Sequence, residues 1–302
     1  MTGESLTRSA TRAWSRPLLT ALDRLEHWPG PDRLASVVRG AVRAVPLGPA
    51  RDVLHGLPLG HPLHPLLVQV PVGAWLSAAV LDCLPGRGRE QQVLIGVGLV
   101  SAAPAAVAGW TDWAELPPEQ ARVGLVHAAA NLTAVSLYAA SLTARLRGRS
   151  TSGRLLAAAG LAAVGAGGAL GGHLSYRQAA GVNHAEAVPH IVPEDWTPLG
   201  AVEDFPVGRA VRAELAGVDV LVVRQPGGGI NGLAGRCSHM AGPLFDGEIA
   251  DGCVRCPWHG SVFRLSDGWN VSGPATAPQP VFECRTADGR VEARLLRPHP
   301  GA

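Results

Sequence analysis

Two short stretches of this sequence each offer one thiolate and one imidazole. The first is Cys237-Ser238-His239 and the second is Cys256-Pro257-Trp258-His259, with sixteen residues between them. Structural zinc sites usually draw a Cys pair from one loop and a His pair from another. Here each loop supplies one ligand of each kind, so the two Cys can hold one iron of a [2Fe–2S] cluster while the two His hold the other. The spacing therefore predicts an iron–sulfur centre with mixed ligation.

Residues 196–298 resemble a Rieske [2Fe–2S] domain of the ferredoxin type. The resemblance is carried by the two ligand loops and by Gly273-Pro274-Ala275, which is placed like the proline loop that shields the cluster in that family. It implies an all-β domain with a Rieske cluster on Cys237, His239, Cys256 and His259. It also implies electron transport, with one electron exchanged at a time with a redox partner protein.

The domain departs informatively from the high-potential Rieske proteins of respiratory complexes. Those proteins carry an extra Cys in each loop, and the pair forms a disulfide, whereas Gly242 and Trp258 stand at these positions here. Ser261 is kept, but Phe263 replaces a Tyr whose hydroxyl donates to a ligand sulfur. Because donors to sulfur stabilise the reduced cluster, losing one lowers the potential. We predict a potential toward the lower part of the range of about −150 to +300 mV, which suits an electron donor and not a quinol oxidant.

The chain as a whole is long enough for about two domains, with 302 residues. Its formal net charge is only +2, which argues against a nucleic-acid partner. Beyond the two predicted ligands, the Cys residues are Cys83, Cys253 and Cys284. This odd number, without the pattern of a small secreted domain, makes structural disulfides unexpected.

Four nearly charge-free runs precede the predicted cluster domain. Each is about the twenty residues that a helix needs to cross a bilayer core of ~30 Å. Buried helices of a soluble protein would show polar faces, and these scarcely do. The runs are residues 65–81, 91–111, 123–144 and 155–176. The sequence thus predicts a multidomain protein of the plasma (cell) membrane. Its parts are an Arg-rich amphipathic region (1–54), an α-helical four-transmembrane-helix bundle in the lipid bilayer (55–177), a linker (178–195) and the all-β Rieske domain.

The first run is preceded by His61-Pro62-Leu63-His64-Pro65. This His-Pro-x-His-Pro motif, followed by four such helices, resembles an uncharacterised bacterial family of small membrane proteins. Some members of that family carry a Rieske domain at the C-terminus. The resemblance covers residues 55–185 and implies an architecture, without a known activity.

The histidines near the membrane segment are expected at one membrane face. Helices one and three begin on the face where helices two and four end, and the Rieske domain emerges there. The residues concerned are His61, His64, His127 and His173. His127 and His173 come at matched depth on neighbouring antiparallel helices, so they could ligate a haem b from both sides. The alternatives are a quinone or metal pocket at the same face, and plain interhelical hydrogen bonding.

The side of the membrane receives conflicting signals. Six arginines lie in the two loops at the other end of the bundle, which favours those loops in the cytoplasm and the Rieske domain outside. They are Arg87, Arg89, Arg145, Arg147, Arg149 and Arg154. Against this, the cluster is normally built in the cytoplasm, and the adjacent Arg pair of a twin-Arg export signal is missing before the fourth helix. A basic amphipathic helix at residues 34–45 would lie on the anionic cytoplasmic leaflet or on the protein's own surface. We expect the cytoplasmic side.

The expected function is that of a membrane-anchored Rieske protein acting as the donor or carrier component of an oxidoreductase system. It would have no catalytic residues and no substrate site of its own. The chain stops soon after Arg297, which leaves no room for the mononuclear iron domain of a terminal oxygenase. The alternatives are a membrane-bound redox sensor and an electron-supply component for a separate oxygenase.

Overall fold

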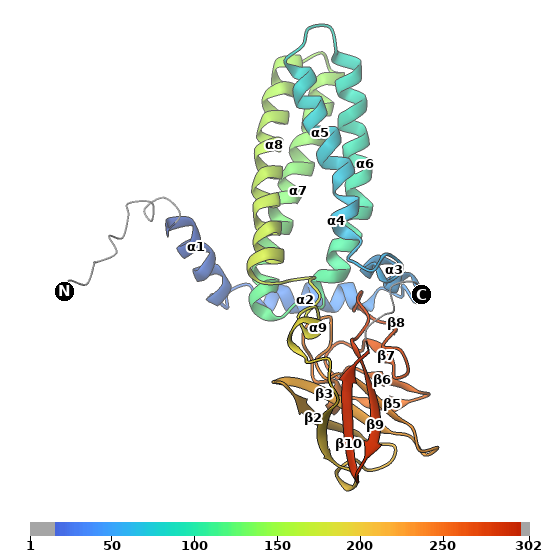
Figure 1. The fold of residues 1–302 in the computed structure, drawn as a ribbon. Coiled ribbons are helices and arrows are strands. Elements are labelled where there is room, and N and C mark those ends of the chain that lie inside the picture. The colour runs from blue at the N-terminus through green and yellow to red at the C-terminus, as the bar shows by residue number, and fades with distance from the viewer. Residues whose placement is uncertain (1–15, 297–302) are drawn as a thin grey trace, which may run out of the picture.

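The computed structural model describes residues 16–296, which form a helical bundle and a β domain. Figure 1 shows the four long helices standing side by side, with the β domain at one end of them. The short helix α2 lies across the junction between the two parts. Of the predicted N-terminal region, residues 1–15 lie outside the described residues.

The N-terminal helices cover the end of the bundle that carries the β domain. They are α1 (Arg16–His27), α2 (Asp32–Ala44), α3 (Ala50–His55) and the 3-10 turn η2 (Leu57–Leu59). In α2 the residues Ala35 and Val38 pack against Trp113 of the bundle, while Leu34 and Val37 are exposed. One face of the amphipathic pattern is therefore used on the protein itself, and a second apolar face is left uncovered.

Four helices are long and apolar enough to cross a membrane, as predicted. They are His64–Asp82, Gly88–Trp113, Pro118–Leu146 and Ser150–Arg177. The first consists of α4 (His64–Leu67) and α5 (Gln69–Asp82), followed by α6 (Gly88–Trp113) and α7 (Pro118–Leu146). The last consists of α8 (Ser150–Gly172) and a π-helical turn, η3 (His173–Arg177).

Aromatic rings set into small residues hold the middle of the bundle together. Trp75 of α5 stacks on Tyr138 of α7, with 4.3 Å between ring centroids, and both side chains are buried. Gly160 of α8 makes room for this pair, since a Cβ there would lie 3.0 Å from the Tyr138 ring. Small residues allow helices to approach closely in lipid, where apolar burial alone gives little drive for association.

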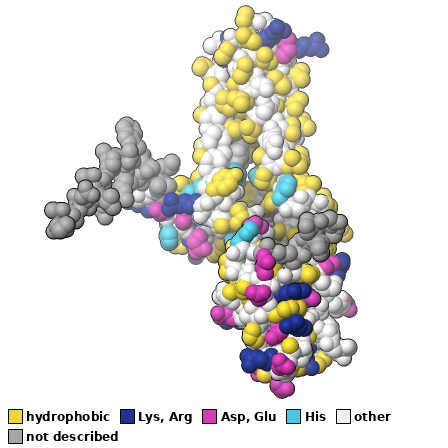
Figure 2. Space-filling view, in the orientation of Figure 1, with side chains coloured by type: hydrophobic (Ala, Val, Ile, Leu, Met, Phe, Trp, Pro, Cys, Tyr) yellow, Lys and Arg dark blue, Asp and Glu magenta, His cyan; other side chains and the backbone are white. Residues whose placement is uncertain are grey.

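The end of the bundle away from the β domain is closed by an ion pair. Arg145 donates to both Asp82 carboxylate oxygens, at 2.9 and 2.7 Å, and to Gln91 Oε1 at 2.7 Å. Further arginines gather at this end on the surface, as Figure 2 shows. The apolar middle of the bundle therefore lies between an arginine-rich end and the end that carries the β domain.

The β domain contains two antiparallel sheets. The six-stranded sheet has the order β1-β10-β9-β4-β3-β2, and the four-stranded sheet has the order β5-β6-β7-β8. The strands are β1 (Thr197–Ala201), β2 (Ala210–Leu215), β3 (Val218–Arg224), β4 (Ile230–Ala234), β5 (Glu248–Ala250), β6 (Cys253–Arg255), β7 (Val262–Arg264), β8 (Asn270–Ser272), β9 (Val281–Ala287) and β10 (Arg290–Leu295). The expected all-β domain is confirmed.

The segment expected to be a linker packs on the larger sheet. It contains the short helix α9 (Val188–Ile191). Val192 is buried in the core of that sheet beside Phe205 and Phe282, and Val188 packs against the same core. The part of this segment from α9 onward therefore belongs physically to the β domain.

Candidate iron–sulfur centre

Both predicted ligand loops fold by the same backbone pattern. The Cys237 N–H donates to Gly242 O at 2.8 Å, and Cys237 O accepts from Ala241 N at 2.8 Å. In the second loop the Cys256 N–H donates to Ser261 O at 2.8 Å, and Cys256 O accepts from Gly260 N at 3.1 Å. Each loop is thus a tight turn that begins at its Cys. Residues in the left-handed region, Ala241 in the first loop and Gly260 in the second, complete the turns.

The fold brings like ligands together. The His239 and His259 rings lie 5.0 Å apart between centroids and at 88° to one another. The Cys237 and Cys256 thiols are hydrogen-bonded to each other, and both residues are buried. A Rieske cluster needs this arrangement, with two thiolates on one iron and two imidazoles on the other.

The protonation chemistry of both imidazoles and of the Cys256 thiol also fits the cluster, while the hydrogen bond with Cys256 and burial raise the pKa of the Cys237 thiol. Nδ1 of His239 is buried without a hydrogen-bond partner, so its lone pair is free for a metal. Burial lowers the pKa of His239 to about 3 and also lowers the pKa of His259, which keeps both imidazoles neutral. The hydrogen bond from Cys237 lowers the pKa of the Cys256 thiol to about 6. Neutral imidazole and thiolate are the forms that bind metal. These residues would hold a [2Fe–2S] cluster, which supplies one-electron chemistry when bound.

A buried glutamine that sequence reasoning did not identify positions the first ligand loop. Gln279 donates from Nε2 to Ala234 O at 2.8 Å and to Arg236 O at 2.7 Å. Its Oε1 accepts from the Ser238 N–H at 2.9 Å. One side chain therefore fixes the backbone on both sides of Cys237, from a position far along the chain.

The predicted neighbours of the cluster surround the second loop. The Ala275 N–H donates to Ser261 Oγ at 3.1 Å, which ties the predicted proline loop, with Pro274, to the second ligand loop. Phe263 is fully buried in the cluster of apolar residues that includes both Cys ligands. Gly242 leaves room for the ligand sulfur, because a Cβ there would lie 2.9 Å from Cys256 Sγ.

The tip of the β domain rests on the bundle. The Gly273 N–H donates to Asp52 Oδ1 of α3 at 3.0 Å. His55 lies within electrostatic range of His239, and Glu115 and Arg43 lie within range of His259. Both predicted imidazole ligands therefore face the membrane domain.

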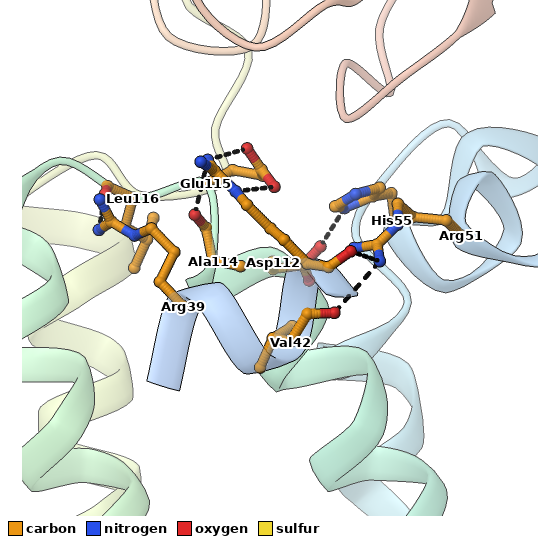
Figure 3. A network of polar contacts seen from close by, with 9 residues as sticks. Arg39, Val42, Arg51, His55, Asp112, Ala114, Glu115 and Leu116 are labelled. Atoms are coloured by element: carbon orange, nitrogen blue, oxygen red, sulfur yellow. Dashed lines mark hydrogen bonds and ion pairs between the residues drawn. The ribbon is translucent and has the colours of Figure 1, made fainter. Parts of the chain in front are cut away.

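A network of polar contacts forms the surface of the bundle under this tip (Figure 3). His55 Nδ1 bonds Asp112 Oδ1 at 2.8 Å. Arg43 donates to Ala114 O at 3.0 Å and to Glu115 Oε2 at 2.7 Å. Figure 3 also shows Arg51 reaching the backbone of α2 at Val42, 3.2 Å away. The sequence did not single out these residues, since they come from three separated segments.

The membrane histidines are arranged differently from the expectation. His173 Nε2 bonds Glu26 Oε1 of α1 at 2.7 Å, while His127 Nδ1 bonds Gly167 O at 2.8 Å. Two imidazoles that face each other were the basis for a haem b at His127 and His173, and this pair does not provide them. His61 is exposed. His64 lies beside His127 instead, with ring centroids 6.2 Å apart.

Comparisons with known proteins agree with both parts of the fold. Residues 195–283 match the Rieske [2Fe-2S] domain, and residues 60–184 match the family described as predicted membrane protein (DUF2231). The fold and the ligand set thus define a Rieske iron–sulfur protein with a membrane domain. The chain belongs to the Rieske [2Fe–2S] family, joined at its N-terminal side to a DUF2231 domain.

Several relatives are similar to the Rieske part. The anthranilate 1,2-dioxygenase ferredoxin subunit of Burkholderia cepacia is 33% identical over 33% of this chain and 93% of its own length. Ferredoxin CarAc of Metapseudomonas resinovorans is 29% identical over 32% of this chain and 90% of its own length. Among solved structures, the ferredoxin of carbazole 1,9a-dioxygenase from Nocardioides aromaticivorans IC177 is 18% identical, covering 33% of this chain and 96% of its own, with a TM-score of 0.31.

Proposed function

We propose that this protein is a membrane-anchored electron carrier that passes single electrons through its Rieske centre to a partner oxidoreductase. The observation that carries the proposal is the pairing of like ligands at the tip of the β domain, with the thiols buried and the imidazoles toward the bundle. A cluster held in this way exchanges electrons and needs no substrate pocket. The four membrane spans keep it at the bilayer.

The chain's own residues favour a potential in the lower Rieske range. Phe263 has no hydroxyl to donate to a ligand sulfur, and Gly242 cannot form a disulfide beside the cluster. Ser261 remains as one donor, held in place by the Ala275 N–H. Fewer donors to sulfur stabilise the reduced cluster less, so the protein gives up its electron more readily.

A more specific partner is suggested by similarity. The ferredoxin subunit from Burkholderia cepacia belongs, by its name, to a dioxygenase, and this chain covers nearly all of it. We therefore infer an electron-supply role toward a separate oxygenase as the second candidate. The two candidates share the cluster and differ in the acceptor.

We place the Rieske domain on the cytoplasmic side of the plasma membrane. Arginines gather at the far end of the bundle, which would favour the opposite orientation. However, the end that bears the β domain has its own basic residues, among them Arg24 and Arg33. Assembly of the cluster in the cytoplasm then supports the cytoplasmic side.

The test is an EPR-monitored redox titration of the full chain in lipid nanodiscs, followed by mixing of the reduced protein with a one-electron acceptor. We expect a Rieske signal that disappears stoichiometrically as the acceptor is reduced, and a midpoint in the lower part of the Rieske range. The Cys237→Ser variant serves as the control without a cluster. A signal that persists in the presence of excess acceptor, or a midpoint near the top of the range, would overturn the proposal.

A further inference from the structure

The helix α2 carries an apolar stripe that no other part of the described chain covers. The stripe consists of Leu34, Val37 and Ala41, all exposed. Val37 is 71% exposed, nearly as open as Val100 in the middle of α6, which is 77% exposed. Val100 belongs to a helix long and apolar enough to cross a membrane, where lipid covers such a side chain. The electron-carrier function assigns no such cover to the stripe on α2.

Two arginines of α2 show which side of the helix faces the β domain. Arg39 donates to Leu116 O at 2.7 Å, and Arg43 donates to Ala114 O at 3.0 Å. Both therefore hold the connection between α6 and α7. Both also lie within electrostatic range of His259, the predicted ligand at the tip of the β domain. The side of α2 that bears these arginines is therefore the side toward the β domain.

The apolar stripe lies on the other side of α2. At about 100° per residue, Val37 and Ala41 are each about 160° around the helix from Arg39, and Leu34 is about 140° from it. Figure 1 shows the β domain at one end of the four long helices, so the direction away from the β domain leads toward the membrane. The stripe therefore points to the membrane side of α2.

The first turn of α2 lies at the depth of the end of a membrane span. Arg122 of α7 donates to both carboxylate oxygens of Asp32, at 2.7 and 2.8 Å. Arg122 is four residues past Pro118, where the third candidate span begins. Four residues of helix rise about 6 Å, so this ion pair lies inside the end of the span. An amphipathic helix that lies flat on a membrane buries its apolar face at this boundary between headgroups and acyl chains.

Basic and aromatic side chains at the edge of the stripe complete the pattern. Arg33 is four positions before Val37 and about 40° around the helix from it. It is exposed, and no ion pair is found for it among residues 16–296. A guanidinium at this place suits the phosphate groups of lipid headgroups. Trp28, in the turn before α2, is also exposed, and Trp is enriched where proteins meet the membrane–water interface.

We propose that α2 is an interfacial helix whose apolar stripe inserts into the leaflet on the side of the β domain, with Arg33 at the lipid phosphates. Its ligand is the phospholipid of the same bilayer that the four spans cross. Arg39 and Arg43 then extend from the lipid-bound helix toward His259. The helix therefore sets the height of the cluster site above the leaflet. This inference goes beyond the electron-carrier function, because lipid binding by α2 needs no cluster.

The test is photo-crosslinking of the full-length protein carrying its cluster, in nanodiscs of phosphatidylcholine and phosphatidylglycerol. Benzoylphenylalanine is placed at Val37 and, in separate variants, at Val100 and Val207. Val100 is the reference for a side chain in lipid, and Val207 is the control, because it is exposed in the β domain beside Arg224 at the end of β3. Mass spectrometry of the intact protein counts phospholipid adducts after irradiation. We expect a similar yield of adducts at Val37 and Val100, and none at Val207.

A charge placed on the stripe gives a second measurement. Val37→Glu should increase deuterium uptake by the α2 amides in nanodiscs, because a carboxylate is unfavourable among acyl chains. Ser36→Glu, at an exposed position off the stripe, should leave the uptake unchanged. An unchanged Rieske EPR signal shows that each variant has folded. Absence of phospholipid adducts at Val37, or equal uptake in the two Glu variants, would overturn the proposal. So would adducts of Val37 with a second copy of the chain, because the stripe would then be an interface between copies.

Discussion

The β domain and the helical bundle use their buried polar side chains in different ways. In the β domain, Ser238, Ser261, Asn270 and Gln279 are buried and bond the backbone around the cluster site. In the helical part, the buried side chains of His55 and Arg145 bond carboxylates at the two ends, while Thr111 and Ser141 bond carbonyl groups of the helix backbone. The bonds in the β domain fix the loops so that the predicted ligands meet. The ion pairs of the helical part hold together the ends of helices whose middle is apolar. A metal site and a membrane span therefore place different demands on the same kinds of atoms.

Loss of a predicted cluster ligand should have the largest effect, and it should separate the β domain from the helical bundle. Cys237→Ser should abolish the Rieske EPR signal completely, because one iron loses half of its thiolate ligands. The bundle should remain inserted, since its contacts do not involve this residue. Circular dichroism and membrane fractionation would check the second point. Cys253→Ser, a strand residue three positions before Cys256, is the control that keeps the cluster. A normal cluster spectrum in Cys237→Ser would contradict the ligand assignment.

Removal of the Arg145–Asp82 ion pair at the far end of the bundle should have the next largest effect, on the stability of the helices. Arg145→Ala leaves Asp82 without its buried partner, and removal of one member of such a pair costs about 3–5 kcal/mol. The side chains of Arg145 and Asp82 are only 3% and 14% exposed, so water compensates little. Thermal unfolding of the helices in detergent would measure the loss, while the Rieske signal should survive in the folded fraction. Arg147→Ala, at an exposed position two residues on, should change the unfolding temperature little.

Gln279 offers the corresponding experiment in the β domain. Gln279→Ala leaves two carbonyls and the Ser238 N–H without their partner, at about 1–3 kcal/mol for each buried group that water cannot reach. We expect a β domain less stable by at least about 3 kcal/mol and a lower cluster content, measured by denaturation and by iron per chain. Gln225→Ala is the control, because that side chain bonds only Asn231. Full cluster content in Gln279→Ala would show that the loop holds its shape alone.

Ser261 and Phe263 should tune the potential in opposite directions. Ser261 Oγ accepts from Ala275, so its own hydrogen is free for a cluster sulfur. Losing a hydrogen bond of about 1 kcal/mol in Ser261→Ala corresponds to about 40 mV for a one-electron couple, as a decrease. Phe263→Tyr should raise the potential by adding a donor. Protein-film voltammetry or EPR titration would measure both. A rise in Ser261→Ala would refute the donor argument.

The smallest effect is expected at an ion-pair cluster beside the first ligand loop. Burial would raise the pKa of Asp219, but hydrogen bonds from Arg212 and Arg236 outweigh it and hold the pKa below its usual range. The stabilisation is therefore complete above the unfolded pKa of about 3.9 and is lost as the pH falls through the folded-state pKa. Asp219→Asn should cost about 1 kcal/mol at pH 7 and flatten the decline below pH 4. Denaturation at both pH values checks this, with the exposed Asp251→Asn as control.

Features that depend on a short stretch of residues could be predicted from the sequence. The two ligand loops and the four spans could be predicted because each is a short pattern with one physical meaning. Gln279 could not be predicted, since its role depends on the register that places β9 beside β4. A glutamine far from the loop gives no sign of its three partners in the sequence.

The pairing of the membrane histidines failed for a different reason. Matched depth was inferred from helix direction, but depth leaves the rotation of each helix undetermined. His173 begins the π-helical turn His173–Arg177, and its side chain bonds Glu26 of α1. His127 is left beside His64. Only the packing of the helices against one another decides which imidazoles meet.

The attachment of α9 to the β domain limits how far that domain can travel. His184 N–H donates to Ser238 O at 2.9 Å, so the chain from His184 onward moves with the ligand loop. The Ala180 N–H donates to Leu174 O of the last span at 2.9 Å, so residues 181–183 join that span to this unit. Fully extended, three residues reach about 10 Å. The point of attachment of the β domain therefore stays close to the end of the last span, and a redox partner has to come to the membrane surface to reach the cluster site.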